Sequence, residues 1–276
     1  MSANASNPNF DPTIPVLVVV RATRFWLTRN ELAQFSGVFG GMFIDAPDIG
    51  VSEEGTLAHP LELHGIEVEE FTPLVHWLRF GANPPDGRPF TKDQLVRMLR
   101  LADLYDMPEA TAFCFQGLQQ LETDPFFLLD LIVRYKNWPL LHQYVERAVK
   151  CPLVDWSFDN ADLYIPLLKL KVSLDEVRRI AAAVPTVILK APTCTNHSVC
   201  VDVWRRDWRL HITEAVFRPV VPQALNQCYA AMVAQSPQPT PCRQRGLRVL
   251  QFNEDFDAEI DLLQDTANLI RARFDV

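Results

Sequence analysis

Residues Ile14 to Thr28, IPVLVVVRATRFWLT, contain two runs of β-branched and aromatic residues around the polar break Arg21-Ala22-Thr23. Such runs favour strands, and a short break between them is typical of an antiparallel hairpin. One helix is expected next, because NELAQFSGVFGGMF (residues 30–43) has apolar residues at three- and four-residue spacing despite its three glycines. The apolar face would consist of Leu32, Phe35, Phe39, Met42 and Phe43.

Residues 59–121 predict one more strand and three helices. HPLEL (59–63) is a short strand candidate, and EVEEFTPLVHWLRF (67–80) has an apolar stripe. Thr91 and Gln94 have the spacing of a capping box that opens a third helix. Pro108 ends that helix, and a fourth then forms an antiparallel hairpin with the third. The inward residues of the fourth helix would be Ala110, Phe113, Cys114, Gly117, Leu118 and Leu121.

Three blocks in this order resemble the BTB/POZ family. FWLTRNELAQFSGVFGGMF (25–43) is similar to that family's hairpin-plus-helix core, and HPLELHGIEVEEFTPLVHWLRFG (59–81) to its third strand, turn and next helix. LVRMLRLADLYDMPEATAFCFQGLQQL (95–121) resembles its closing helical pair. DLIVRYKNWPLLHQYVERAVK (130–150) and TCTNHSVCVDVWRRDW (193–208) look like the helical tails of BTB proteins of mushroom-forming (basidiomycete) fungi.

The resemblance implies an α+β fold class, with a BTB/POZ-like domain (a short β-sheet with a cluster of α-helices) followed by an all-α C-terminal region. The expected boundaries are a flexible N-terminal tail at 1–13, the BTB/POZ-like domain at 14–122 and the α-helical region at 123–276. The tail is polar and rich in Asn and Pro, so it does not predict the extra helix that some family members exchange between subunits.

The resemblance also implies a non-enzymatic protein–protein interaction module. One interpretation is that the chain is a substrate adaptor for a cullin-RING ubiquitin ligase, with a cullin as partner. The alternative is a self-associating scaffold or transcription-associated protein without a ubiquitin-ligase role. Phe90-Thr91-Lys92 ends in lysine where cullin-binding members often carry glutamate, which disfavours the adaptor. Pro15 and Thr28 replace charged residues that shape a co-repressor groove in the family's transcription factors.

Family members commonly pair through the first helix, and the apolar face here is wider than one buried stripe requires. A weak homodimer is therefore expected, with a protein-interaction surface made of Leu32, Phe35, Val38, Phe39 and Met42.

Composition and charge exclude several classes of function. The chain has 10 glycines and contains no GxGxxG, GxxxxGK[ST], GxSxG or HExxH motif, so glycine-loop nucleotide folds and common catalytic motifs are not indicated. The net charge is −8, and residues 1–124 hold 8 Lys/Arg against 17 Asp/Glu, which disfavours nucleic-acid binding there.

No apolar stretch approaches the length of a membrane span, and no signal peptide is indicated. We expect an intracellular protein of the cytoplasm or nucleus that binds neither nucleic acid nor membrane.

The six cysteines are scattered and are expected to be reduced. Cys194-x-x-His197-x-x-Cys200 has metal-ligand residue types, but a structural zinc site needs four ligands and only three are local. A loop without metal is the favoured interpretation, and a thiol nucleophile lacks a third partner group. The sequence therefore predicts no catalytic, cofactor or metal site.

The C-terminal region predicts further helices. Tyr105-Asp-Met-Pro108 is echoed by Tyr135-Lys-Asn-Trp-Pro139, either as a structural repeat or as reuse of a helix-breaking proline. Ser173 and Glu176 suggest a capping box, 224–233 is compatible with a helix, and 255–274 has helical spacing.

Two groups of basic residues and one linker are predicted in this region. From Val201 onwards, Trp204 and Trp208 lie on an apolar stripe, so the nearby arginines are more simply its solvated face than a grip on nucleic acid. Ser236 to Gln244 is expected to be a linker. The arginines that follow Cys242 are expected to be surface charge; they are Arg243, Arg245 and Arg248.

Overall fold

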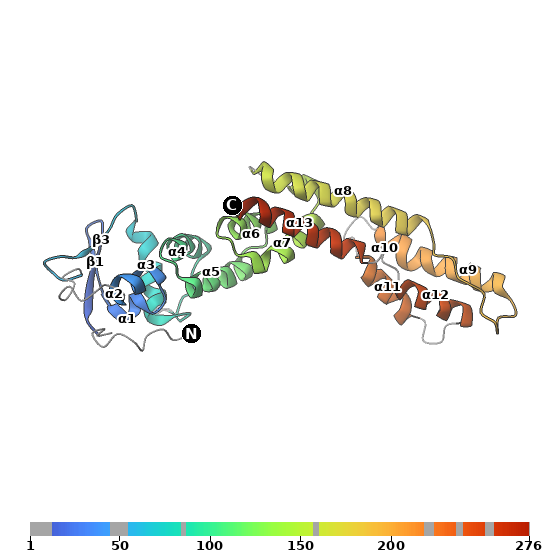
Figure 1. Ribbon diagram of the computed structural model, residues 1–276, viewed down its shortest axis with the longest axis horizontal. Coiled ribbons are helices and arrows are strands. Elements are labelled where there is room, and N and C mark those ends of the chain that lie inside the picture. Colours follow the sequence, from blue (N-terminus) through green and yellow to red (C-terminus); the bar gives the residue numbers. More distant parts are fainter. Residues whose placement is uncertain are drawn as a thin grey trace. The chain divides into compact units, whose positions relative to one another are not determined.

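The computed structural model describes residues 13–44, 55–83, 87–156, 160–217, 224–235, 240–251 and 257–275 (Figure 1). The chain forms two compact units, Met1–Thr123 and Asp124–Val276, here called unit 1 and unit 2. Unit 1 combines a three-stranded sheet with helices, so the predicted α+β class is confirmed at that level. The predicted N-terminal tail, apart from Thr13, lies outside the described residues.

The sheet has the order β2-β1-β3, formed by β1 (Pro15–Val20), β2 (Thr23–Thr28) and β3 (Leu61–Leu63). β1 and β2 pair antiparallel with Val20 opposite Thr23, which confirms the hairpin but places Thr23 in the strand. Arg21 adopts a φ of 57°, the left-handed conformation that a two-residue hairpin turn requires. β3 lies parallel to β1, which makes β1 the central, largely buried strand.

The prediction of a single helix after the hairpin is wrong, because the structure has two helices there, α1 (Arg29–Ala33) and α2 (Gly37–Ile44). Ser36 separates them. Its hydroxyl accepts a hydrogen bond from the Phe39 backbone N–H at 3.1 Å, as an N-cap does, and donates to the Tyr105 carbonyl at 2.5 Å. The break is therefore fixed partly by a contact 69 residues away in the chain.

The three helices that complete unit 1 agree with the sequence pattern in most respects. α3 (Val68–Phe80) buries its predicted stripe. The predicted capping box of Thr91 and Gln94 opens α4 (Lys92–Leu104) and is confirmed. α5 (Pro108–Leu121) begins at the predicted proline, but Leu121 is 51% exposed rather than inward, and Phe115 is buried in addition to the predicted residues.

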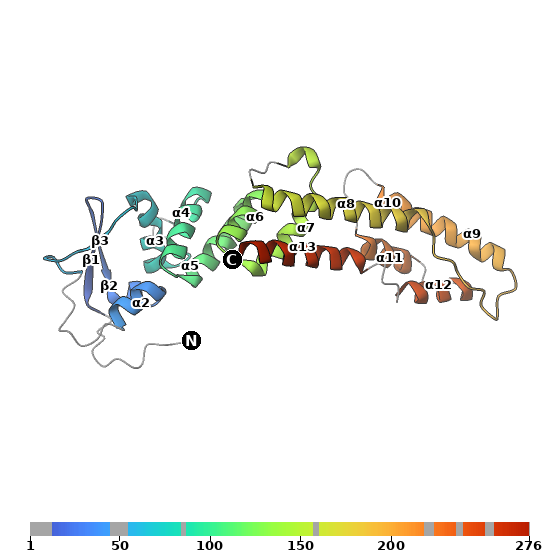
Figure 2. The same ribbon diagram turned by 45° about the horizontal axis from the view of Figure 1, so that its top comes forward.

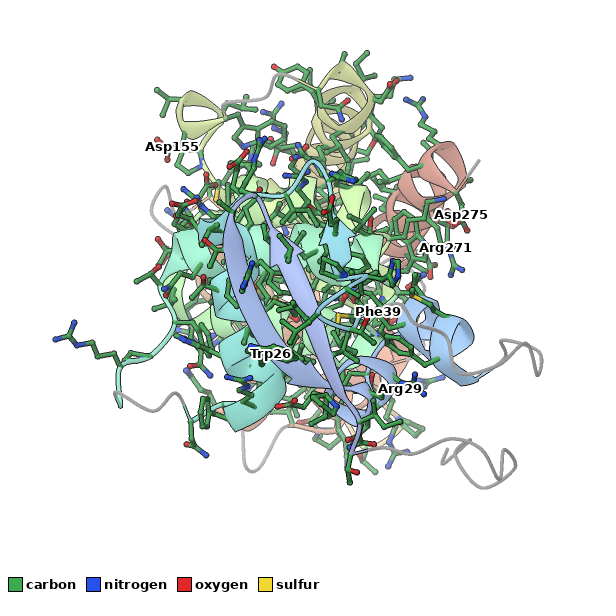
Figure 3. The ribbon with its side chains drawn as sticks, turned by 90° about the vertical axis from the view of Figure 1, so that its left-hand side faces the viewer. Trp26, Arg29, Phe39, Asp155, Arg271 and Asp275 are labelled. Atoms are coloured by element: carbon green, nitrogen blue, oxygen red, sulfur yellow. The ribbon has the colours of Figure 1, made fainter. Side chains whose placement is uncertain are left out.

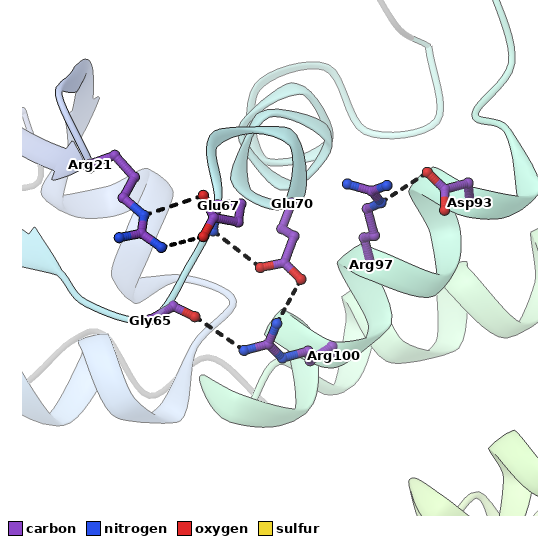
Figure 4. A network of polar contacts seen from close by, with 7 residues as sticks. All are labelled: Arg21, Gly65, Glu67, Glu70, Asp93, Arg97 and Arg100. Atoms are coloured by element: carbon purple, nitrogen blue, oxygen red, sulfur yellow. Dashed lines mark hydrogen bonds and ion pairs between the residues drawn. The ribbon is translucent and has the colours of Figure 1, made fainter.

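A polar network ties the hairpin turn to α3 and α4 (Figure 4). Arg21 pairs with Glu67, which precedes α3, and this hydrogen bond is the main cause that lowers the pKa of Glu67. Arg100 on α4 contacts Glu70 at 2.6 Å and donates to the Gly65 carbonyl at 3.2 Å. Arg21 and Glu67 are both largely exposed, so their pair adds little to stability, whereas Glu70 is largely buried and only its partner Arg100 is exposed.

In the described part of unit 2, every regular element is a helix. In chain order they are α6 (Pro125–Arg134), α7 (Trp138–Lys150), the 3-10 turn η1 (Leu153–Asp155), α8 (Ala161–Ala183), α9 (His197–Trp208), the π-helical turn η2 (Arg209–Thr213), α10 (Glu214–Val216), α11 (Leu225–Ala234), α12 (Pro241–Gln251) and α13 (Ala258–Phe274). α13 lies beside α8 and contacts α7 (Figures 1 and 2). None of the helices described in the two units is both long and apolar enough to cross a membrane.

The structure corrects two predictions for this unit. α8 runs without interruption through Ser173 and is capped by Asn160, whose side chain accepts from the Asp162 backbone N–H at 3.0 Å. Ser173 therefore opens no helix. α12 begins at Pro241, inside the segment predicted to be a linker, and 236–239 of that segment lie outside the described residues.

The echo between the two units extends to the geometry of the turn. Asp106 has a φ of 48° and Lys136 a φ of 52°. In each turn the following backbone N–H bonds back into the preceding helix, Met107 to the Ala102 carbonyl at 2.7 Å and Asn137 to the Ile132 carbonyl at 2.9 Å. In each pair, the two helices are thus joined by a left-handed C-terminal turn of the same kind.

A hydrophobic core of unit 2 surrounds two tryptophans of α9. Trp204 donates its indole N–H to the Thr186 carbonyl at 2.7 Å, and Trp208 donates to the Ala181 carbonyl at 3.0 Å. The predicted apolar stripe is confirmed, since both rings are buried. The other fully or largely buried members of this core are Ala182, Ile188, Ala191, Cys200, Ile212, Ala215, Val216, Leu225, Cys228, Met232, Cys242, Leu247 and Leu250.

Arg243 was expected to be surface charge, and that expectation is wrong. Its guanidinium is largely buried, lies 3.0 Å from the Asp207 carboxylate of α9 and donates to the Met232 carbonyl. Arg245 and Arg248 are exposed, as expected.

Candidate functional site

α2 is apolar on every side. Its sequence, GVFGGMFI, contains no polar side chain. Phe39 and Phe43 point into unit 1, and the Phe39 ring, labelled in Figure 3, stacks on Tyr105 with the ring centres 4.7 Å apart. Val38 is on the other side of the helix and is 48% exposed. An apolar helix of a folded protein is ordinarily buried all round, and this one is not.

The structure divides the predicted interaction surface into three groups: buried, half-buried and exposed residues. Leu32 and Phe39 belong to the core of unit 1. Phe35 and Met42 are half-buried, and the Phe35 ring packs edge-on against Trp77 with the ring centres 5.1 Å apart. Only Val38 is exposed. The break at Ser36 explains the division, because it gives α2 an orientation that a continuous helix could not have.

Arg29, at the start of α1, lies next to this region. Its guanidinium is largely buried and sits 5.7 Å above the centre of the Phe43 ring. Its Nε has no hydrogen-bond partner among the described residues. The Phe43 ring is therefore one partner of the buried charge.

A concave region of unit 1 lies between α4, α5 and the residues that precede α4. It is a cavity of about 280 Å³ whose apolar lining includes Phe90, Phe113 and Leu121. Lys92, the last residue of Phe90-Thr91-Lys92, forms an ion pair with Glu122 at the end of α5. The cavity is small, and among its described lining residues none is charged.

Three cysteines and one histidine of unit 2 form a cluster of which the sequence predicted only three members. Cys194 lies in the turn before α9, His197 is its first residue, and Cys200 follows one turn later. Cys242, from the first turn of α12, joins them. One ligand atom each of Cys194, His197 and Cys242 lie within 4.8 Å of one another, and the Sγ atoms of Cys194 and Cys200 are 3.7 Å apart.

The thiols differ in their electrostatic surroundings. The backbone N–H of Ala191 donates to Cys242 Sγ at 3.2 Å, and this hydrogen bond is the largest cause that lowers the pKa of Cys242 to about 7. The neighbouring thiol of Cys242 is the largest cause that raises the pKa of Cys194 to about 11. Elsewhere, burial raises the pKa of Cys114 and Cys228, as expected for packed, unreactive thiols.

No protein-family model matches the chain, and no curated protein matches it either. Its function has to be inferred from its own residues.

Sequence reasoning missed Cys242 because it follows Cys200 by 42 positions in the chain, beyond any local ligand spacing. The sequence signal for Cys242 was weak, because this cysteine lies in the first turn of a helix that was predicted to be a linker. It also missed the buried pair of Arg243 and Asp207, for which neither residue has a local partner.

Proposed function

We propose that the chain is a non-enzymatic protein–protein interaction module of the BTB/POZ type that self-associates through α2. The order of elements in unit 1 supports this. A hairpin, two short helices, a third strand, a further helix and a closing helical pair follow one another as the three resembling sequence blocks would require.

The observation that carries the proposal is the apolar surface of α2. A helix without polar side chains that leaves Val38 48% exposed has apolar area available for a partner. A second copy of the chain is the occupant we favour, because a self-complementary contact needs no charge on either side and α2 offers none. The surface, made of Val38, Met42 and the edge of Phe35, is small, so the dimer should be weak and reversible.

Sedimentation velocity over a range of concentrations tests this proposal. The wild type should show a monomer–dimer equilibrium, and Val38→Glu should shift it towards monomer, because the dimer would bury an unpaired carboxylate. Val172→Glu is a matched control: it makes the same substitution at a residue of α8 that is 60% exposed, and it should leave the equilibrium unchanged.

Circular dichroism must show that both variants keep the wild-type helical content. A monomeric wild type at high micromolar concentration would contradict the proposal. So would a folded Val38→Glu variant that dimerises like the wild type.

A cullin-binding adaptor is the second candidate, and the apolar cavity beside Phe90 is the observation that favours it. A charge exchange tests it without removing an ion pair. Lys92→Glu combined with Glu122→Lys keeps the pair and creates the Phe-x-Glu pattern of cullin-binding relatives. If the module binds cullins, a purified cullin N-terminal domain should bind the double variant more tightly than the wild type in biolayer interferometry. If the cullin domain bound neither the wild type nor the double variant, the adaptor function would be excluded.

A further inference from the structure

The Cys/His cluster of unit 2 brings together four side chains of the types that bind zinc. Three come from the start of α9 and the turn before it, Cys194, His197 and Cys200. The fourth, Cys242, comes from α12. Three cysteines and one histidine are among the ligand sets of structural zinc sites.

The spacing of the ligand atoms fits one tetrahedral ion. With zinc–sulfur bonds of about 2.3 Å, the sulfur atoms of a tetrahedral site are about 3.8 Å apart. The Sγ atoms of Cys194 and Cys200 are separated by 3.7 Å, whereas a disulfide would need about 2.05 Å. Ligand atoms of Cys194, His197 and Cys242 lie within 4.8 Å of one another and need to close by only a short distance. Cys200 is outside that closely spaced set and reaches the cluster through Cys194, so its side chain has to move further to complete the site.

Two further observations point to a ligand at this place. Nδ1 of His197 is buried and has no hydrogen-bond partner among the described residues. A buried ring nitrogen is rarely left unpaired, and a bound cation would satisfy it. In addition, the Ala191 N–H donates to Cys242 Sγ, a contact that stabilises a thiolate and supports a metal ligand from outside the coordination sphere.

We propose that Cys194, His197, Cys200 and Cys242 bind one structural zinc ion. Four protein ligands complete its coordination and leave no position for water or substrate, so the ion has a structural and not a catalytic role.

The position of the site indicates what the ion stabilises. Residues 184–196 form neither helix nor strand, and within them Ile188 and Ala191 are buried against the core around Trp204. Gly246 on α12 packs so closely that an added Cβ would lie 2.5 Å from Ile188 Cγ2. The ion would link the irregular segment and the start of α9 to the first turn of α12, and would thereby stabilise the contact between Ile188 and Gly246.

The first test measures metal in the full-length wild type, purified without an affinity tag that binds metal. Mass spectrometry with an inductively coupled plasma should find about one zinc per chain. Cobalt(II) in place of zinc should give the visible absorption of a tetrahedral, thiolate-ligated ion. Trace zinc together with no such cobalt spectrum would overturn the proposal, as would a Cys194–Cys200 disulfide found by thiol alkylation of the freshly purified protein.

Variants then assign the ligands. Cys242→Ser and His197→Ala should each lose zinc and lower the melting temperature, and a chelator should lower the wild-type melting temperature in the same way. Cys151→Ser is the control, because Cys151 is a half-buried thiol of unit 2 that donates to the Arg147 carbonyl away from the cluster. His197 is only half-buried, so His197→Ala stays informative if Cys242→Ser fails to fold. Full zinc content in folded His197→Ala, or equal loss in Cys151→Ser, would refute the assignment.

Discussion

Replacing Glu259 by alanine should destabilise unit 2 far more than an ordinary loss of surface charge. Glu259 lies in the first turn of α13 and is 3% exposed. One carboxylate oxygen accepts from Nε of Arg178 on α8, and the other accepts from the backbone N–H of Leu225 at 2.8 Å. Leu225 is the first residue of α11, so one side chain joins three helices.

The expected cost follows from what the substitution leaves behind. The side chain of Arg178 is 11% exposed, and removing one partner of a buried ion pair costs about 3–5 kcal/mol. The residual exposure of Arg178 places the effect near the lower limit. The unsatisfied N–H of Leu225 adds about 1 kcal/mol. We expect the free energy of unfolding of Glu259→Ala to fall by about 3–4 kcal/mol in total.

Urea unfolding followed by circular dichroism measures this change, and two further variants sharpen it. Glu146→Ala removes a carboxylate of the same type from an exposed pair with Lys150 on α7, and should cost no more than about 0.5 kcal/mol. Arg178→Met combined with Glu259→Met removes both charges and should recover most of the loss, because replacing a whole buried pair by apolar side chains is often close to neutral. A Glu259→Ala variant within about 1 kcal/mol of the wild type would refute the buried pair as described.

Four smaller predictions concern packing, turns, caps and the boundary. Gly246→Ala should cost about 1–3 kcal/mol in thermal unfolding, because the new Cβ would lie 2.5 Å from Ile188 Cγ2; no change would show that this contact is loose. Lys136→Gly should raise stability by up to about 1 kcal/mol, because glycine adopts a φ of 52° without strain; a lower melting temperature would contradict this. Thr91→Ala should cost about 1 kcal/mol in urea unfolding through loss of the N-cap bond; an unchanged free energy of unfolding would show that this cap does not stabilise α4. A fragment ending at Thr123 should show the cooperative melting of a folded protein by circular dichroism; aggregation of the fragment under conditions in which the full chain is soluble would mean that the units fold as one.

Elements whose pattern is complete within a few residues were predictable. The alternation of β-branched and aromatic residues around Arg21 predicted the hairpin, and the spacing of Thr91 and Gln94 predicted the start of α4. Both rest on hydrogen bonds and side-chain periods between near neighbours in the chain, and such interactions do not depend on the rest of the fold. The prediction that the same capping pattern at Ser173 opens a helix was wrong. Ser173 lies inside α8, where the backbone amide groups bond to carbonyls of the preceding turn and need no cap.

The sequence by itself thus determined the α+β class, the hairpin, the starts of α4 and α5 and the apolar sides of α3 and α9. Only the tertiary structure decided that Ser36 breaks a helix, since its hydroxyl bonds to the carbonyl of Tyr105. Only the tertiary structure brought Cys242 to Cys194 and paired Arg243 with Asp207. In each case the partner is tens of residues away along the chain. Local propensity cannot register such a contact, because it forms only when whole helices pack against one another and bring distant side chains into reach.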